Sequence, residues 1–290
     1  MRLQFSASLS TLGETPSFAR SVCICQKEPN VKRTLLLLLA ACVTLMSCTK
    51  YEAPTTSPQT VSTTVTSAYA LGGRTHIAVR NAIGPLTLIG GETDASVNIV
   101  MNLQVTSLEG LKAFTQLSSI QVVDQSQGDT LRLVVNYPRS EPRYVYAAHP
   151  TFLTPYRVAC SIDSVQGVVT VSDLGALLTI RNAHAVRVMR HDGSCNIESI
   201  DGGVYAEVKL SANGNCVVNV ASGDITLKVP ASTSANVTAR SLSGTVSHSG
   251  LTFSGLNQQQ SSLTGRLGTG NGEIRLETAS GNIVIQVWPL

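Results

Sequence analysis

Charged residues are scarce in this chain. Only 13% of its 290 residues are charged, and its formal net charge is +3. A nucleic-acid-binding protein needs a strong basic field, which this chain lacks, so we expect no nucleic-acid partner. The hydrophobic share is 43%, and we therefore expect a sizeable buried core.

Motifs of known enzyme and metal sites are also missing. The chain has no Gly-x-Ser-x-Gly elbow and no evident pair of catalytic carboxylates. The glycine-rich residues 265–272 lack the Gly-Lys-Ser/Thr of a phosphate loop. His184 and His191 have no carboxylates at metal-site spacing. We expect a protein that is not an enzyme and holds no metal or cofactor.

No hydrophobic run is long enough to span a membrane. The run at residues 35–46 has twelve residues, whereas a spanning helix needs about twenty. Lys32 and Arg33 precede this run, and the sequence LMSC at residues 45–48 closes it. This order is typical of a secretory signal peptide, which we place at residues 31–47.

The ending LMSC resembles the bacterial lipobox. This resemblance implies that Cys48 is acylated and becomes the new N-terminus, so that several acyl chains anchor the protein stably to a membrane. Thr49 rather than aspartate follows Cys48, which by analogy favours the outer membrane of the cell envelope.

Residues 1–30 lie upstream of this signal. We expect that they are an artefact of start-site assignment and that translation starts at Val31. Removing residues 1–47 takes away five of the 21 basic and two of the 18 acidic residues. The mature chain would then carry sixteen of each and be formally neutral.

The mature chain is expected to begin with a tether and an irregular N-terminal part. Residues 48–68 are rich in Ser, Thr and Pro and have no apolar period, which is typical of a flexible linker. Residues 69–165 follow, with short strands, one amphipathic helix at residues 107–119 and a hairpin at residues 120–135. Ser107 is the expected N-cap of the helix.

Residues 137–156 differ from the rest because they hold four prolines and five aromatic residues. Central strands exclude proline, so we expect an irregular surface excursion. Ring stacking and guanidinium forks could bind a glycan or another cell-surface ligand here. The candidate residues are Tyr144, Tyr146, Arg139, Arg143 and Arg157. Alternatively, the aromatic side chains cap the open end of a repeat fold.

From residue 166 to residue 290 the chain is repetitive. A small residue and then alternating side chains recur about every nine to ten residues, as in GNCVVNV (214–220), GDITLKV (223–229) and GNIVIQV (281–287), with a loop at residues 257–264. Such short strands and turns favour a β-solenoid, with an antiparallel β-sandwich as the alternative. The expected inward residues are Cys216, Val218, Val220, Ile225, Leu227, Val229, Ile283, Ile285 and Val287.

Three segments carry a family resemblance: SGDITL (222–227), GRLGTGNGEI (265–274) and SGNIVI (280–285). They resemble segments of bacterial envelope proteins grouped as candidate adhesins with β-strand repeats, a domain of unknown function. The resemblance covers residues 71–287. It implies an all-β, right-handed parallel β-solenoid with a short α-helix in its N-terminal part and with no known active site.

Cys195 and Cys216 occupy the same inward offset, one coil apart. Adjacent strands lie about 4.8 Å apart, which is within the range for a disulfide. The secreted compartment is oxidising. The alternative is a pair of small buried thiols in neighbouring coils.

A basic run contains Arg181, His184, Arg187, Arg190 and His191. It could bind acidic glycans or lipid phosphates. We expect instead that these side chains lie on solvated outer faces of strands, because alternate residues of a strand point outward.

The favoured function is that of a non-enzymatic, lipid-anchored envelope protein that acts as an adhesin or binds a surface ligand such as a glycan. Two alternatives stay open. One is a polysaccharide-processing β-helix enzyme, which would need charged residues clustered on one outer sheet. The other is a structural component of an envelope-stress system.

Overall fold

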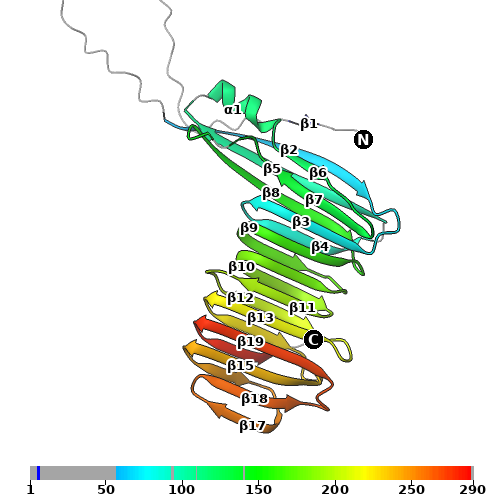
Figure 1. Cartoon of the computed structure of the whole chain (residues 1–290), viewed down its shortest axis with the longest axis vertical. Coiled ribbons are helices and arrows are strands. Elements are labelled where there is room, and N and C mark those ends of the chain that lie inside the picture. Colours follow the sequence, from blue (N-terminus) through cyan, green and yellow to red (C-terminus); the bar gives the residue numbers. More distant parts are fainter. Residues whose placement is uncertain (1–4, 7–56, 93–94, 109, 140, 289–290) are drawn as a thin grey trace, which may run out of the picture. The chain divides into compact units, whose positions relative to one another are not determined.

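The structure is a computed structural model that describes residues 5–6, 57–92, 95–108, 110–139 and 141–288. The expected signal peptide, Cys48 and residues 48–56 of the expected tether lie outside these ranges. The described part consists almost entirely of strands (Figure 1), with one eight-residue helix, α1 (Gly110–Leu117). No helix of this part has the length and apolar content needed to cross a bilayer.

The strands are numbered in chain order. The first ones are β1 (Phe5–Ser6), β2 (Gln59–Ala70), β3 (His76–Ile83), β4 (Leu86–Glu92), β5 (Ser96–Ser107), β6 (Gln121–Asp124), β7 (Thr130–Asn136), β8 (Tyr144–Pro155), β9 (Ala159–Ser172) and β10 (Leu178–Asp192). The later ones are β11 (Cys195–Ser199), β12 (Val204–Lys209), β13 (Asn215–Ser222), β14 (Ile225–Val229), β15 (Ala235–Ser243), β16 (Val246–Ser249), β17 (Phe253–Gln259), β18 (Ser262–Leu267), β19 (Gly272–Ser280) and β20 (Ile283–Val287).

Most of these strands stack in parallel around one hydrophobic core. Sheet A has the order β6-β7-β3-β9-β10-β11-β13-β19-β15-β18-β17. Sheet B has the order β2-β5-β8-β4-β9-β10-β12-β14-β20-β16. The long strands β9 and β10 contribute to both sheets. This parallel stacking confirms the solenoid and is incompatible with the antiparallel sandwich.

The predicted register of the repeats is confirmed. Cys195 lies opposite Cys216, and Ile225 lies opposite Ile283. The expected inward residues are buried, except that Val287 at the end of β20 is only partly buried. The corners stack so closely that a Cβ on Gly281, which has a φ of 147°, would lie 2.2 Å from the Gly223 carbonyl oxygen. Glycine is therefore required at this corner.

The stacking order departs from the chain order at the C-terminal end. Strands β19 and β20 lie between β13–β14 and β15–β16, so the last coil fills a space that the earlier coils leave. Strands β17 and β18 form an antiparallel hairpin beside β15. The prediction of a loop at residues 257–264 is therefore wrong, because these residues belong to the hairpin. This hairpin escaped notice because the residues of β17 after Phe253 are all exposed and show no apolar alternation.

The N-terminal end is closed by antiparallel strands and by α1. Strands β7 and β8 form the outermost parallel coil, and β5 and β2 extend sheet B beyond it. The helix α1 packs against β2 and β5. The prediction that Ser107 is the N-cap of the helix is wrong. Ser107 is the last residue of β5 and pairs with Gln59 of β2 and Tyr144 of β8. The helix buries Ala113 and Leu117 and leaves Phe114 exposed.

The second half of the expected tether is a strand. Residues 59–70 form β2, which pairs with β5 along its whole length. Val61, Val65 and Tyr69 pack partly against the core, and Thr63 and Ser67 complete the same period-2 face. The tether prediction failed there because threonine is common both in linkers and in strands.

The expected irregular excursion is also largely a strand. Residues 144–155 form β8, which lies between β5 and β4. Pro155 is its last residue, and Pro150 comes one residue before the pairing with β4 begins at Thr151. Pro150 lies opposite Met101 in the ladder with β5 and just outside the parallel ladder with β4, so its missing N–H does not interrupt the parallel ladder.

Candidate functional site

The aromatic candidates lie inside the fold. Tyr144 and Tyr146 are 8% and 9% exposed, and their ring centroids are 6.1 Å apart. Tyr146 donates a hydrogen bond to the Gln116 side-chain oxygen of α1 at 3.3 Å. Neither ring offers a free face to a sugar, so this geometry supports the capping alternative for both side chains.

The basic candidates do not gather in one place. Arg139 and Arg143 precede β8, Arg157 follows it, and all three are exposed. The twelve residues of β8 span about 40 Å at about 3.3 Å per residue. The length of β8 therefore separates Arg157 from Arg139 and Arg143, and the three arginines do not surround one ligand.

Cys195 and Cys216 lie side by side, as the repeat register predicted. Both are buried, and their sulfur atoms are 3.2 Å apart as two thiols. Interaction with the Cys216 side chain and burial raise the pKa of Cys195, so the pair is unsuited to serve as a nucleophile. Cys160 is a third buried thiol, and burial raises its pKa to about 12.

Two residues of the basic run lie against carboxylates. Arg190 donates two hydrogen bonds of 2.6 Å to Asp173, which hold the pKa of that carboxyl below its usual range. His184 lies 2.6 Å from Asp201. The expectation that the side chains of the basic run are solvated is wrong for His191, which is fully buried. Within the described ranges, no cluster of three or more His, Cys, Asp or Glu residues could hold a metal ion.

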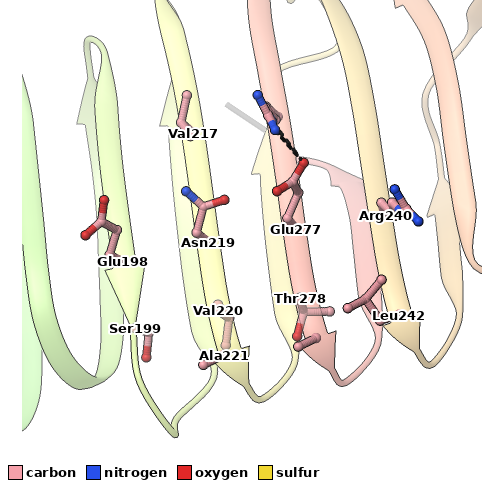
Figure 2. Close-up of a pocket in the computed structure, with 12 residues that line it drawn as sticks. Glu198, Ser199, Val217, Asn219, Val220, Ala221, Arg240, Leu242, Glu277 and Thr278 are labelled. Carbon is pink, nitrogen blue, oxygen red and sulfur yellow. Dashed lines mark hydrogen bonds and ion pairs between the residues drawn. The ribbon is translucent and has the colours of Figure 1, made fainter.

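A groove of about 680 Å³ lies on the outer surface of sheet A, across β11, β13, β19 and β15. The middle strands present the small side chains of Ala221 and Ala279. The longer side chains of Glu198 and Arg240 stand on the two flanking strands (Figure 2). The surface is therefore hollow where these two short side chains lie on the middle strands. Leu242 adds an apolar wall and is 69% exposed.

The groove carries opposite charges at its two rims. Glu198, Asn219, Glu277 and Arg240 lie in one outward row, because their strands pair in register. Arg275 binds Glu277 through two hydrogen bonds of 2.8 and 3.0 Å. Among the described residues, Glu198 and Arg240 have no ion-pair partner. Three strand spacings, about 14 Å, separate the free carboxylate from the free guanidinium.

The sequence contains a signal for this groove, although no known motif marks it. Glu198, Asn219 and Glu277 each lie five residues after a corner glycine, and Arg240 lies five residues after the equivalent Ala235. Aligning the repeats by their corners would have placed these four residues in one row. The order of the row would still have been wrong, because β19 lies between β13 and β15.

Comparisons with known proteins bear on the fold. The family model Toastrack DUF4097 matches residues 101–286. A candidate cell adhesion protein from Clostridium sporogenes is 12% identical, with 80% of this chain and 100% of that chain covered and a TM-score of 0.46. A candidate adhesin from Bacteroides fragilis is 11% identical, with 77% and 96% covered and a TM-score of 0.27. No curated protein matches the chain.

Proposed function

This chain belongs to the Toastrack DUF4097 family, and we propose that it is a non-enzymatic, lipid-anchored envelope protein that binds a surface ligand in the groove of sheet A. The proposal makes it an adhesin or a glycan-binding protein. The solenoid offers a rigid outer sheet for such a ligand, and the lipobox-like sequence that ends at Cys48 motivates the anchor.

The groove is the single observation that carries this proposal. Arg240 is exposed and has no anionic partner in the described part of the chain. A guanidinium binds carboxylate and sulfate groups with two parallel hydrogen bonds. Leu242, Ala221 and Ala279 line the same groove and supply apolar contacts. An acidic polysaccharide, whose sugar rings also have apolar faces, suits this combination.

The anchor would hold the start of β2 within reach of the membrane, while the groove begins six strands further along the stack, about 29 Å away. Cys48 precedes the first residue of β2 by eleven positions, and an extended segment of that length spans at most about 40 Å. By its chemistry, acylated Cys48 would make the membrane one partner and leave the outer sheet free for the other.

A glycan array that includes sulfated and carboxylated polymers tests the ligand assignment. Ala221→Trp should fill the groove without touching the core, because Ala221 is exposed, and it should abolish binding seen with the unmodified protein. The control is Ser247→Trp, which adds a tryptophan to an exposed position on β16 of sheet B. Equal binding by both variants would refute the groove as the site.

One observation favours a second candidate, a polysaccharide-processing enzyme. Glu198 and Glu277 flank Asn219 in the outward row, so about 10 Å separates their strands. This value is close to the carboxyl separation of inverting glycosidases, about 6.5–9.5 Å. Product analysis of the polymers bound on the array separates the two candidates, since cleavage that Glu198→Gln abolishes would favour the enzyme.

A further inference from the structure

Apart from the two-residue strand β1, which pairs with β2, the two sheets have four edge strands in the described part of the chain. Three of them are poorly suited to pair with another strand. Strands β6 and β16 have only four residues each. Strand β17 has a register shift between Ser254 and Asn257, and its Gly255 has a φ of 63°. Short and irregular edges protect a protein against unwanted strand pairing.

The fourth edge, β2, has none of these protections. Its twelve residues pair with β5 in one unbroken register. Its sequence contains no charged residue, no proline and no glycine. Val61, Val65 and Tyr69 are only partly buried against the core, so another strand could cover more of their apolar surface. Such an edge is a template for strand addition.

The short strand β1 shows how this edge accepts a strand. It pairs antiparallel with the middle of β2, with Phe5 opposite Val65 and Ser6 opposite Thr64. This pairing shows that the middle of the β2 edge can accept an antiparallel strand. By the processing proposed at Cys48, β1 is removed, and the middle of the β2 edge becomes free in the mature protein.

We propose that β2 of the mature chain pairs antiparallel with β2 of a second copy, around a two-fold axis at Val65. The pairing is antiparallel, as it is between β1 and β2. In this register Val65 faces Val65 of the partner subunit, and Thr64 faces Thr66 of the partner subunit. Val61 faces Tyr69 of the partner subunit. No like charges oppose each other, because β2 has none, and the interface is self-complementary as a two-fold axis requires.

Disulfide cross-linking of Val65→Cys in membranes tests this interface. Opposite residues of an antiparallel pair have Cα atoms about 4.5–5.5 Å apart, within the range for a disulfide. Under oxidising conditions, a non-reducing gel should show a band of twice the chain mass, at least about five-fold stronger than for Ser247→Cys on the short edge β16. Adding Thr66→Lys, at an exposed position of β2, should largely abolish the band by placing two ammonium groups near the axis.

Each other result overturns the proposal. A Val65→Cys band no stronger than that of Ser247→Cys rules out the register, and a band that survives Thr66→Lys rules out edge pairing. An adduct with a protein of different mass identifies another occupant of the edge. Because the inference rests on processing at Cys48, mass spectrometry of the same sample is included. If the chain is cleaved before Cys48 but shows no cross-linked band, the dimer is overturned and the anchor is not. If the chain is not cleaved there, both the dimer and the anchor are overturned.

Discussion

The N-terminal region, residues 58–165, and the repeat region, residues 166–290, build the same two sheets by different means. The repeats contribute mostly short strands that pair in parallel with the same side-chain offsets. The N-terminal region contributes the twelve-residue strands β2, β5 and β8, which pair antiparallel with each other. It also contains α1, which packs against two of them.

This difference reflects the different packing needs of the middle coils and the end coil of a solenoid. A coil in the middle needs only a face that fits the next coil, so a short repeat is sufficient. The end coil has a face with no neighbour, and it must be covered by something other than a repeat. Strands β2 and β5, the helix α1 and the buried Tyr144 and Tyr146 provide that cover.

The largest expected effect is a loss of stability caused by a substitution in the repeat region. Ile225→Asp places an unpaired carboxylate in a fully buried position and should lower the free energy of unfolding by about 5 kcal/mol. Thr226→Asp, one residue later, points outward and should be tolerated. Thermal unfolding measures both variants, and equal melting temperatures would contradict the side-chain alternation.

The sequence predicted the repeats well and the end region poorly, for a physical reason. Ile225, Leu227 and Val229 alternate after a glycine corner, and this local pattern alone fixes their inward direction. Tyr144 and Pro150 gave no comparable signal, because their strand is defined by pairing with the distant β4 and β5. The groove was predictable only in part. The repeat places Glu198, Asn219, Glu277 and Arg240 at equivalent positions, but the order of their strands depends on the insertion of β19 between β13 and β15.

The second prediction concerns Tyr144 and Tyr146, which help to cover the N-terminal end of the stack. Replacing Tyr144 and Tyr146 together with serine removes two buried rings and the hydrogen bond to Gln116. We expect a loss of about 4 kcal/mol in unfolding free energy without a loss of ligand binding. Calorimetry and the glycan array measure the two effects. Unchanged stability combined with lost binding would return the ligand site to this region.

The third prediction concerns Cys195 and Cys216, whose thiols are 3.2 Å apart. We propose that they form a disulfide during folding in the envelope, giving two protons and two electrons to an oxidant there. The bond would close a loop of 21 residues and stabilise the fold by about 3 kcal/mol. Thiol counting in denaturant should find only Cys160 reactive before reduction, and three reactive thiols would contradict the bond.

The smallest effect is a pH dependence located at His191 in the repeat region. Burial lowers the pKa of His191, and its Nδ1 atom has no hydrogen-bond partner in the described structure. The folded state therefore binds fewer protons than the unfolded state, whose histidine pKa is about 6.5. Stability should fall as the pH drops below about 6.5 toward the folded pKa. His191→Leu should remove this part of the melting-temperature change between pH 7.5 and pH 5.5, and an unchanged slope would contradict it.

The measurement that most directly tests the account compares one arginine from each region. Arg240 stands at the rim of the groove, and Arg143 precedes β8 at the N-terminal end. An acidic polymer selected on the glycan array is titrated into the Arg240→Gln and Arg143→Gln variants by calorimetry. We predict that Arg240→Gln weakens binding at least about ten-fold, as expected for the loss of a charged hydrogen bond, and that Arg143→Gln binds normally. Normal binding by Arg240→Gln with weakened binding by Arg143→Gln would contradict the account and place the ligand at the N-terminal end.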